Sequence, residues 1–132
     1  MNGYQVYRRT QAQTASPAEL VVMLYRGAVR FATAGGDALE RCNLEAAHNN
    51  LVRAQAIVSE LASSLDVDHG GEIARNLLGL YGYVNRCLVE ANVRKSVEPA
   101  REAQRLLRDL LEAWEEAARQ PSPGGSAAAV AA

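Results

Sequence analysis

The chain has 132 residues and a formal net charge of −1, with 14 basic and 15 acidic side chains interspersed along it. This length suits a single domain with a real core, and a hydrophobic content of 48% argues against disorder. The balanced charge excludes the one-sided basic surface that binds nucleic acid or an anionic membrane. The chain has no apolar run of about 18 residues, so no membrane span is expected.

The first fifteen residues are predicted to form a cap on the rest of the chain. Tyr4, Val6 and Tyr7 make a small apolar cluster that is too short for a helix standing alone. We interpret residues 1–15 as a lid over an apolar groove, and the alternative is a frayed terminus. The segment lacks the basic-then-apolar order of a signal peptide, so a cytoplasmic location is expected.

The start of the first helix is marked by Ser16 and Pro17. The serine side chain can accept from the free amides of the first turn, and proline at the first helical position loses no hydrogen bond. Apolar residues then recur at helical spacing to about Arg41. Gly35 and Gly36 lie inside this span and weaken the helix, but the apolar pattern continues beyond them.

Three further helices follow, joined by short links. Asn43 can cap a second helix over about residues 44–65, whose apolar residues form a heptad seam. A turn with two glycines precedes a third helix over about residues 72–93, and Pro99 sits in the first turn of a fourth over about residues 98–119. The Gly-, Pro- and Ala-rich residues 120–132 are expected to be a disordered tail.

The fold class predicted from these elements is all-α. Short links force neighbouring helices to pack antiparallel, so residues 16–119 are expected to form an up-down-up-down four-helix bundle with the short N-terminal segment packed on it.

No constellation of residues predicts catalysis, a metal or a cofactor. Glu45 and His48 match the spacing of a di-iron ligand pair once, without the second copy that such bundles need. Cys42 and Cys87 form no zinc motif, and we interpret both as reduced, small hydrophobic residues. An enzyme is therefore not expected.

The third and fourth helices carry two apolar rows each, although a helix in a small bundle needs one. The second row either fills a squat core or lines a groove for a partner. The predicted groove-lining residues on the third helix are Leu77, Tyr81, Val84 and Leu88.

Several segments resemble one family in order and spacing. The opening Thr14-Ala15-Ser16-Pro17, followed by Met23-Leu24-Tyr25-Arg26-Gly27-Ala28, is similar to the start of the flagellar secretion chaperones, the FliS family. Later segments that match are residues 50–61, 70–77, 80–84, 90–92 and 110–114. Arg26 and Gly82 depart from the family pattern, which usually has Asp or Asn at the first position and Asp at the second.

The resemblance implies a cytoplasmic four-helix bundle that binds the disordered C-terminal region of flagellin. It implies that binding keeps flagellin monomeric until the type III secretion gate takes it. Tyr7 matches the family's N-terminal tyrosine, which is associated with covering the groove and docking at the export gate, and Tyr4 is grouped with it as a partner-binding residue. The alternative is a self-associating helical-bundle adaptor with no export client.

Overall fold

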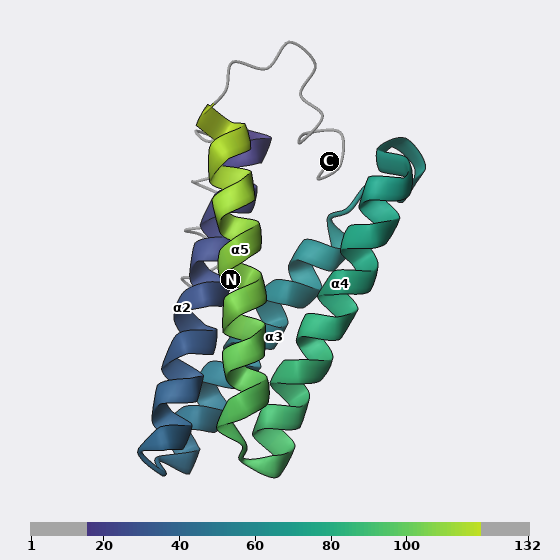
Figure 1. Ribbon diagram of the computed structural model, residues 1–132. Coiled ribbons are helices and arrows are strands. Elements are labelled where there is room, and N and C mark those ends of the chain that lie inside the picture. Colours follow the sequence, from purple (N-terminus) through teal and green to yellow (C-terminus); the bar gives the residue numbers. More distant parts are fainter. Residues whose placement is uncertain (1–15, 120–132) are drawn as a thin grey trace, which may run out of the picture.

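Four helices account for nearly all of residues 16–119, the part of the chain that the computed structural model describes (Figure 1). They are α2 (Pro17–Glu40), α3 (Leu44–Ser63), α4 (Val67–Arg94) and α5 (Val97–Arg119). Each helix packs against the one before it, and α5 returns to lie against α2. The predicted all-α, antiparallel up-down-up-down bundle is confirmed, and no strand occurs among residues 16–119. Tyr4, Tyr7, the predicted lid and the predicted tail lie outside the described residues.

The helix starts follow the capping signals of the sequence. The Ser16 Oγ accepts from the amide of Glu19 at 3.2 Å, with Pro17 at the first helical position. The Asn43 Oδ1 accepts from the amide of Ala46 at 3.2 Å in the same way at the start of α3. Each cap satisfies an amide that the first turn would otherwise leave free.

The start of α4 differs from the prediction, which placed it at about residue 72. Asp66 caps an additional turn by accepting from the amide of His69 at 3.1 Å, so that α4 begins at Val67. Gly71 then kinks the chain with φ of 59°, a conformation that glycine adopts readily, and the regular helix runs on from there. The other predicted ends lie within two residues of those observed.

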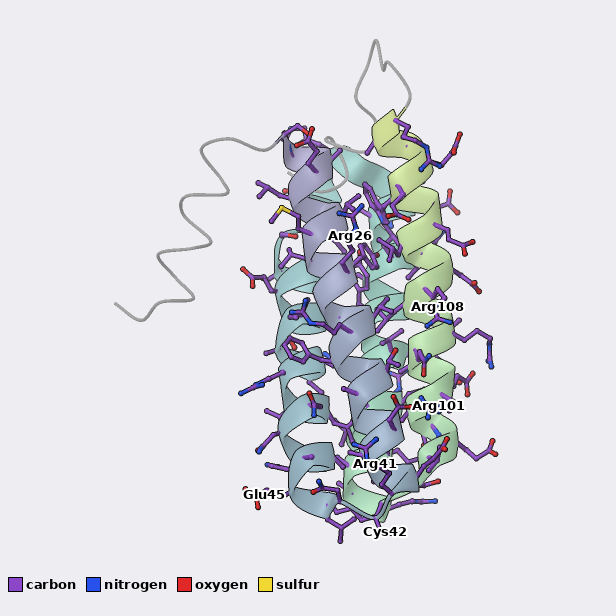
Figure 2. All side chains as sticks on the ribbon, turned by 90° about the vertical axis from the view of Figure 1, so that its left-hand side faces the viewer. Arg26, Arg41, Cys42, Glu45, Arg101 and Arg108 are labelled. Carbon is purple, nitrogen blue, oxygen red and sulfur yellow. The ribbon has the colours of Figure 1, made fainter. Side chains whose placement is uncertain are left out.

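Gly35 and Gly36 remain helical because the neighbouring helices lie directly on their backbone. A Cβ atom on Gly35 would stand 2.7 Å from a methyl carbon of Leu51 on α3. A Cβ atom on Gly36 would stand 2.8 Å from the Arg101 guanidinium of α5. Arg101 crosses this bare surface to reach Asp37 at 2.7 Å and Glu40 at 2.8 Å (Figure 2). The two glycines thus bring α2 close to both neighbours.

The core is built from small and branched side chains around two tyrosines. Tyr25 and Leu51 are completely buried, and Tyr81 is 2% exposed. Toward its N-terminal end α4 diverges from α5, as Figure 1 shows. Among residues 16–119, no helix is both long enough and apolar enough to cross a membrane.

Replacing Gly35 by alanine is expected to destabilise the bundle, although alanine normally strengthens a helix. The new methyl group would overpack Leu51 at a cost of roughly 2–3 kcal/mol, of which the better helix propensity offsets about 1 kcal/mol. Chemical denaturation should therefore show a lower free energy of unfolding for Gly35→Ala.

The matched control is Gly79→Ala on α4, where no atom lies within 4 Å of the new Cβ. This variant should gain about 0.5–1 kcal/mol. Equal stabilisation by the two substitutions would show that Leu51 moves aside without cost.

Candidate partner-binding surface

Three of the predicted groove-lining residues lie in the core of the bundle. Tyr81, Val84 and Leu88 are 2%, 0% and 0% exposed, and Leu77 is half-buried at the edge of the same row. In this conformation the three buried side chains hold α4 onto the bundle, and their contact with a partner stays a prediction. Tyr4 and Tyr7 lie outside the described residues.

A hydrogen bond between two tyrosines joins α2 to α4 across the core. The Tyr25 and Tyr81 hydroxyl oxygens are 2.5 Å apart, and the Tyr25 ring also packs on Trp114 of α5 with centroids 6.3 Å apart. Burial raises the pKa of both tyrosines, because the interior disfavours a phenolate. The residues are 56 positions apart, so local spacing gave no sign of this pair.

The exposed apolar side chains gather on α4. Among residues 16–119, seven large hydrophobic side chains are exposed, and five of them belong to this helix. They are Ile73, Leu78, Tyr83, Val89 and Val93. Their share of the total shows that α4 presents more apolar surface than the bundle covers.

One row of α4, which we call the outer stripe, consists of Leu78, Gly82, Val89 and Val93. The steps of four, seven and four residues keep these positions on one side of the helix. Leu78 is 43% exposed, Val89 45% and Val93 74%. A shallow hollow of about 570 Å³ follows the C-terminal part of the stripe. It is lined by Gly82, Asn85, Arg86, Val89, Glu90, Val93 and Arg94. The four residues of the stripe are uncharged, and the Arg86 guanidinium lies beside Gly82, 3.5 Å from where a Cβ atom would stand.

Helix α3 extends this neutral surface on one side. The Asn85 Nδ2 donates to the Ser59 Oγ at 3.0 Å, and Asn92 contacts the His48 ring at 2.9 Å. Because the two helices are antiparallel, these contacts place Val52, which is 42% exposed, at the level of Val89. The apolar surface therefore spans the α3–α4 pair, with uncharged polar groups between the helices.

Arginines form the other edge of the stripe. Arg75 and Arg86 are exposed on α4, eleven residues and so three helical turns apart. Neither forms an ion pair with a carboxylate among residues 16–119. Arg86 instead lies 5.8 Å from the centre of the Tyr83 ring. This edge offers positive charge to whatever lies on the stripe.

The seam between α4 and α5 has a different character. A hollow of about 660 Å³ there is lined mostly by arginines and glutamates, with Tyr83 and Cys87. The Tyr83 hydroxyl donates to Glu102 at 2.8 Å, which raises the pKa of Tyr83 to about 12. Arg94 and Arg105 face Glu90 and Glu102 at 3.4 Å and 3.7 Å. These opposite charges face one another, so this seam is poorly suited to an apolar segment.

Side chains that could hold a metal ion do not come together in the described part of the chain. Residues 16–119 contain no group of three or more His, Cys, Asp or Glu side chains that could hold a metal ion. His48 contacts Asn92, and His69 contacts Asp66. Cys42 and Cys87 are both unpaired, the first exposed and the second buried.

Comparison with known proteins identifies the family of the chain. The family model described as "Flagellar protein FliS" matches residues 1–121. The chain belongs to the FliS family. Two similar proteins are the flagellar secretion chaperones FliS of Salmonella typhimurium strain LT2 and of Bacillus subtilis strain 168. The first is 36% identical over 123 residues, covering 92% of this chain and 88% of the relative. The second is 32% identical over 116 residues, covering 88% and 86%.

Membership of the FliS family places the chain among the flagellar export chaperones. The resemblance inferred from the sequence motifs is thereby confirmed. The relatives are named as chaperones, which assist other proteins without chemical turnover, and this suggests a protein as the partner of the chain.

The tyrosine pair makes a prediction about stability. Tyr25→Phe or Tyr81→Phe breaks the buried hydrogen bond and leaves the remaining hydroxyl with one partner fewer, which costs about 1–3 kcal/mol. The double variant removes both hydroxyl groups, so its loss should be clearly smaller than the sum of the two single losses. Urea denaturation of the four proteins measures this coupling, and strictly additive losses would mean that the hydrogen bond contributes nothing.

Proposed function

We propose that this protein binds the disordered C-terminal region of flagellin in the cytoplasm, prevents its premature polymerisation and delivers it to the flagellar type III secretion apparatus. The observation that carries the proposal is the outer stripe of α4, an exposed and uncharged apolar row that the bundle leaves uncovered. Family membership supports the flagellar client.

The physical character of the stripe suits a client that orders on binding. A disordered segment pays conformational entropy when it becomes ordered, and burial of a long apolar row offsets that cost. The hollow beside Gly82 and Val89 is shallow, so affinity has to come from length of contact along α4 and not from one deep pocket. A segment in extended or helical form can supply such a contact.

Leu77 lies at the border of this surface. It is half-buried on the same helix, beside the exposed Leu78. We therefore keep Leu77 as a partner contact. The buried side chains of α4 support the surface indirectly, by holding the helix in place; they are Tyr81, Val84 and Leu88. They would contact flagellin directly only if α4 moved away from the bundle.

We also propose that residues 1–15 form a lid over the apolar surface and that Tyr7 takes part in docking at the export gate. An extended chain covers roughly 3.3–3.6 Å per residue, so Tyr7 can reach about 30 Å from Ser16. That distance is comparable with the length of α2, which allows the segment to reach much of the bundle surface. The support for the lid is the apolar cluster of Tyr4, Val6 and Tyr7 and the family resemblance.

A charge on the stripe should abolish the proposed binding. Calorimetric titration of the full chain with a peptide of the flagellin C-terminal region is expected to show saturable one-to-one binding with a negative heat-capacity change. Val89→Glu should weaken it by about tenfold or more, because the carboxylate would lose its water of hydration against the apolar face of the client. The thermal unfolding midpoint should barely change.

Ala113→Glu serves as the control, because Ala113 is exposed on α5, a helix that takes no part in the outer stripe. It should bind as the wild type does. If the wild-type chain gives no complex and its mass by light scattering rises with concentration, self-association through the stripe is the better account.

The lid makes a separate prediction. Tyr7→Ala should leave the helical content and unfolding midpoint of the bundle unchanged while altering the affinity for the flagellin peptide or for the export-gate component. Circular dichroism and the same titration test this. Loss of the folded bundle in Tyr7→Ala would contradict a lid that only covers the surface.

A further inference from the structure

The glycines inside the helices fall into two groups. A Cβ atom on Gly27 would stand 3.1 Å from Ile57, and those on Gly35 and Gly36 would approach their neighbours more closely still. Packing within the chain therefore accounts for these three. On α4, a Cβ atom on Gly79 would meet no atom within 4 Å, and one on Gly82 only the Arg86 side chain at an ordinary 3.5 Å. Nothing inside the described part of the protein requires glycine at either α4 position.

Only one of these two α4 glycines lies on the apolar surface. Gly82 stands in the outer stripe between Leu78 and Val89, and it also lines the hollow. Gly79 lies about 60° further round the helix, since each residue turns it by roughly 100°. Glycine inside a helix is destabilising relative to alanine. Gly82 therefore weakens α4, and it leaves a position without a side chain in the apolar row between Leu78 and Val89.

We propose that Gly82 is a specificity-determining contact, at which the backbone of an amphipathic client helix crosses closely over α4. This inference rests on the proposed function and names the form of the client at the same surface. Side chains of the client helix would pack on Leu78 to one side of the crossing and on Val89 and Val93 to the other. A missing side chain is what allows two helix backbones to approach closely at such a crossing.

The positive charge beside the stripe indicates that the client helix carries acidic residues. Arg75 and Arg86 border the stripe on the side away from α3, and neither is ion-paired within residues 16–119. They stand three turns apart, roughly 16 Å along the axis. On the α3 side, Val52, Ala56 and Ser59 carry no charge. The client that fits is a helix with an uncharged apolar face and carboxylates along one flank.

The test compares Gly82→Ala with Gly79→Ala in the full-length chain, using the flagellin C-terminal peptide as probe. Both substitutions should raise the thermal unfolding midpoint, because both replace a helical glycine at which a new Cβ atom would meet no crowding. Gly82→Ala should weaken peptide binding by about tenfold, and Gly82→Leu by more, whereas Gly79→Ala should bind as the wild type does.

The outcomes separate this inference from the proposed function. If the wild type binds and Gly82→Ala binds equally well, the close crossing is wrong and the chaperone proposal stands. If the wild type does not bind the peptide, the proposed function itself fails. A concentration-dependent dimer that Gly82→Leu dissociates, and that the peptide does not compete away, would assign the stripe to a second copy and overturn the proposal.

Charge is tested in the same titration. The double variant Arg75→Gln/Arg86→Gln should weaken binding by about three- to tenfold and reduce the dependence of affinity on salt. Arg108→Gln is the matched control, because Arg108 is exposed on α5 (Figure 2) and unpaired within residues 16–119. An unchanged salt dependence in the double variant would overturn the acidic flank of the client.

Discussion

The hydrogen bond between the Tyr25 and Tyr81 hydroxyls, at 2.5 Å, fixes how α4 is rotated about its own axis. Both rings are buried, so turning α4 would break this hydrogen bond and leave the Tyr81 hydroxyl in the core without a partner, at about 1–3 kcal/mol. With Tyr81 held inward, Val84 and Leu88 follow it into the core by helical spacing. The opposite side of the same helix must then face outward, and that side carries Leu78, Gly82, Val89 and Val93.

The other helices explain why α4 is the one left partly uncovered. Helix α2 buries nine of its 24 residues and presents Gly35 and Gly36 to its neighbours, which lie almost on its backbone. Helix α4 buries six of 28. Arg101 further ties α5 to α2 through Asp37 and Glu40. Helix α2 is therefore packed closely by both α3 and α5, whereas α4 carries most of the large exposed apolar side chains among residues 16–119.

Much of this fold can be predicted from the sequence because its determinants are local. Ser16, Asn43 and the heptad seam of α3 act within one or two turns, and the helices they predict are observed. The added first turn of α4 was missed because it depends on Asp66 capping a segment with no apolar period. The candidate site was harder to predict, because the outer stripe is interrupted at Gly82 and has no apolar residue between there and Val89. Which side of α4 faces inward depends on contacts with helices distant in sequence, among them that of Tyr81 with Tyr25.

An export chaperone must also release its client, and the form of the surface bears on this requirement. The outer stripe is shallow and its own four residues are uncharged, so a bound helix would bury mainly apolar area, with ion pairs to Arg75 and Arg86 only along one flank. Affinity of this kind is spread along the contact, and a client can be removed from one end in small steps, each losing little free energy. A deep pocket around one anchor residue would instead have to be emptied at once. A long, shallow stripe on a rigid helix is thus compatible with holding a disordered segment securely and handing it over progressively.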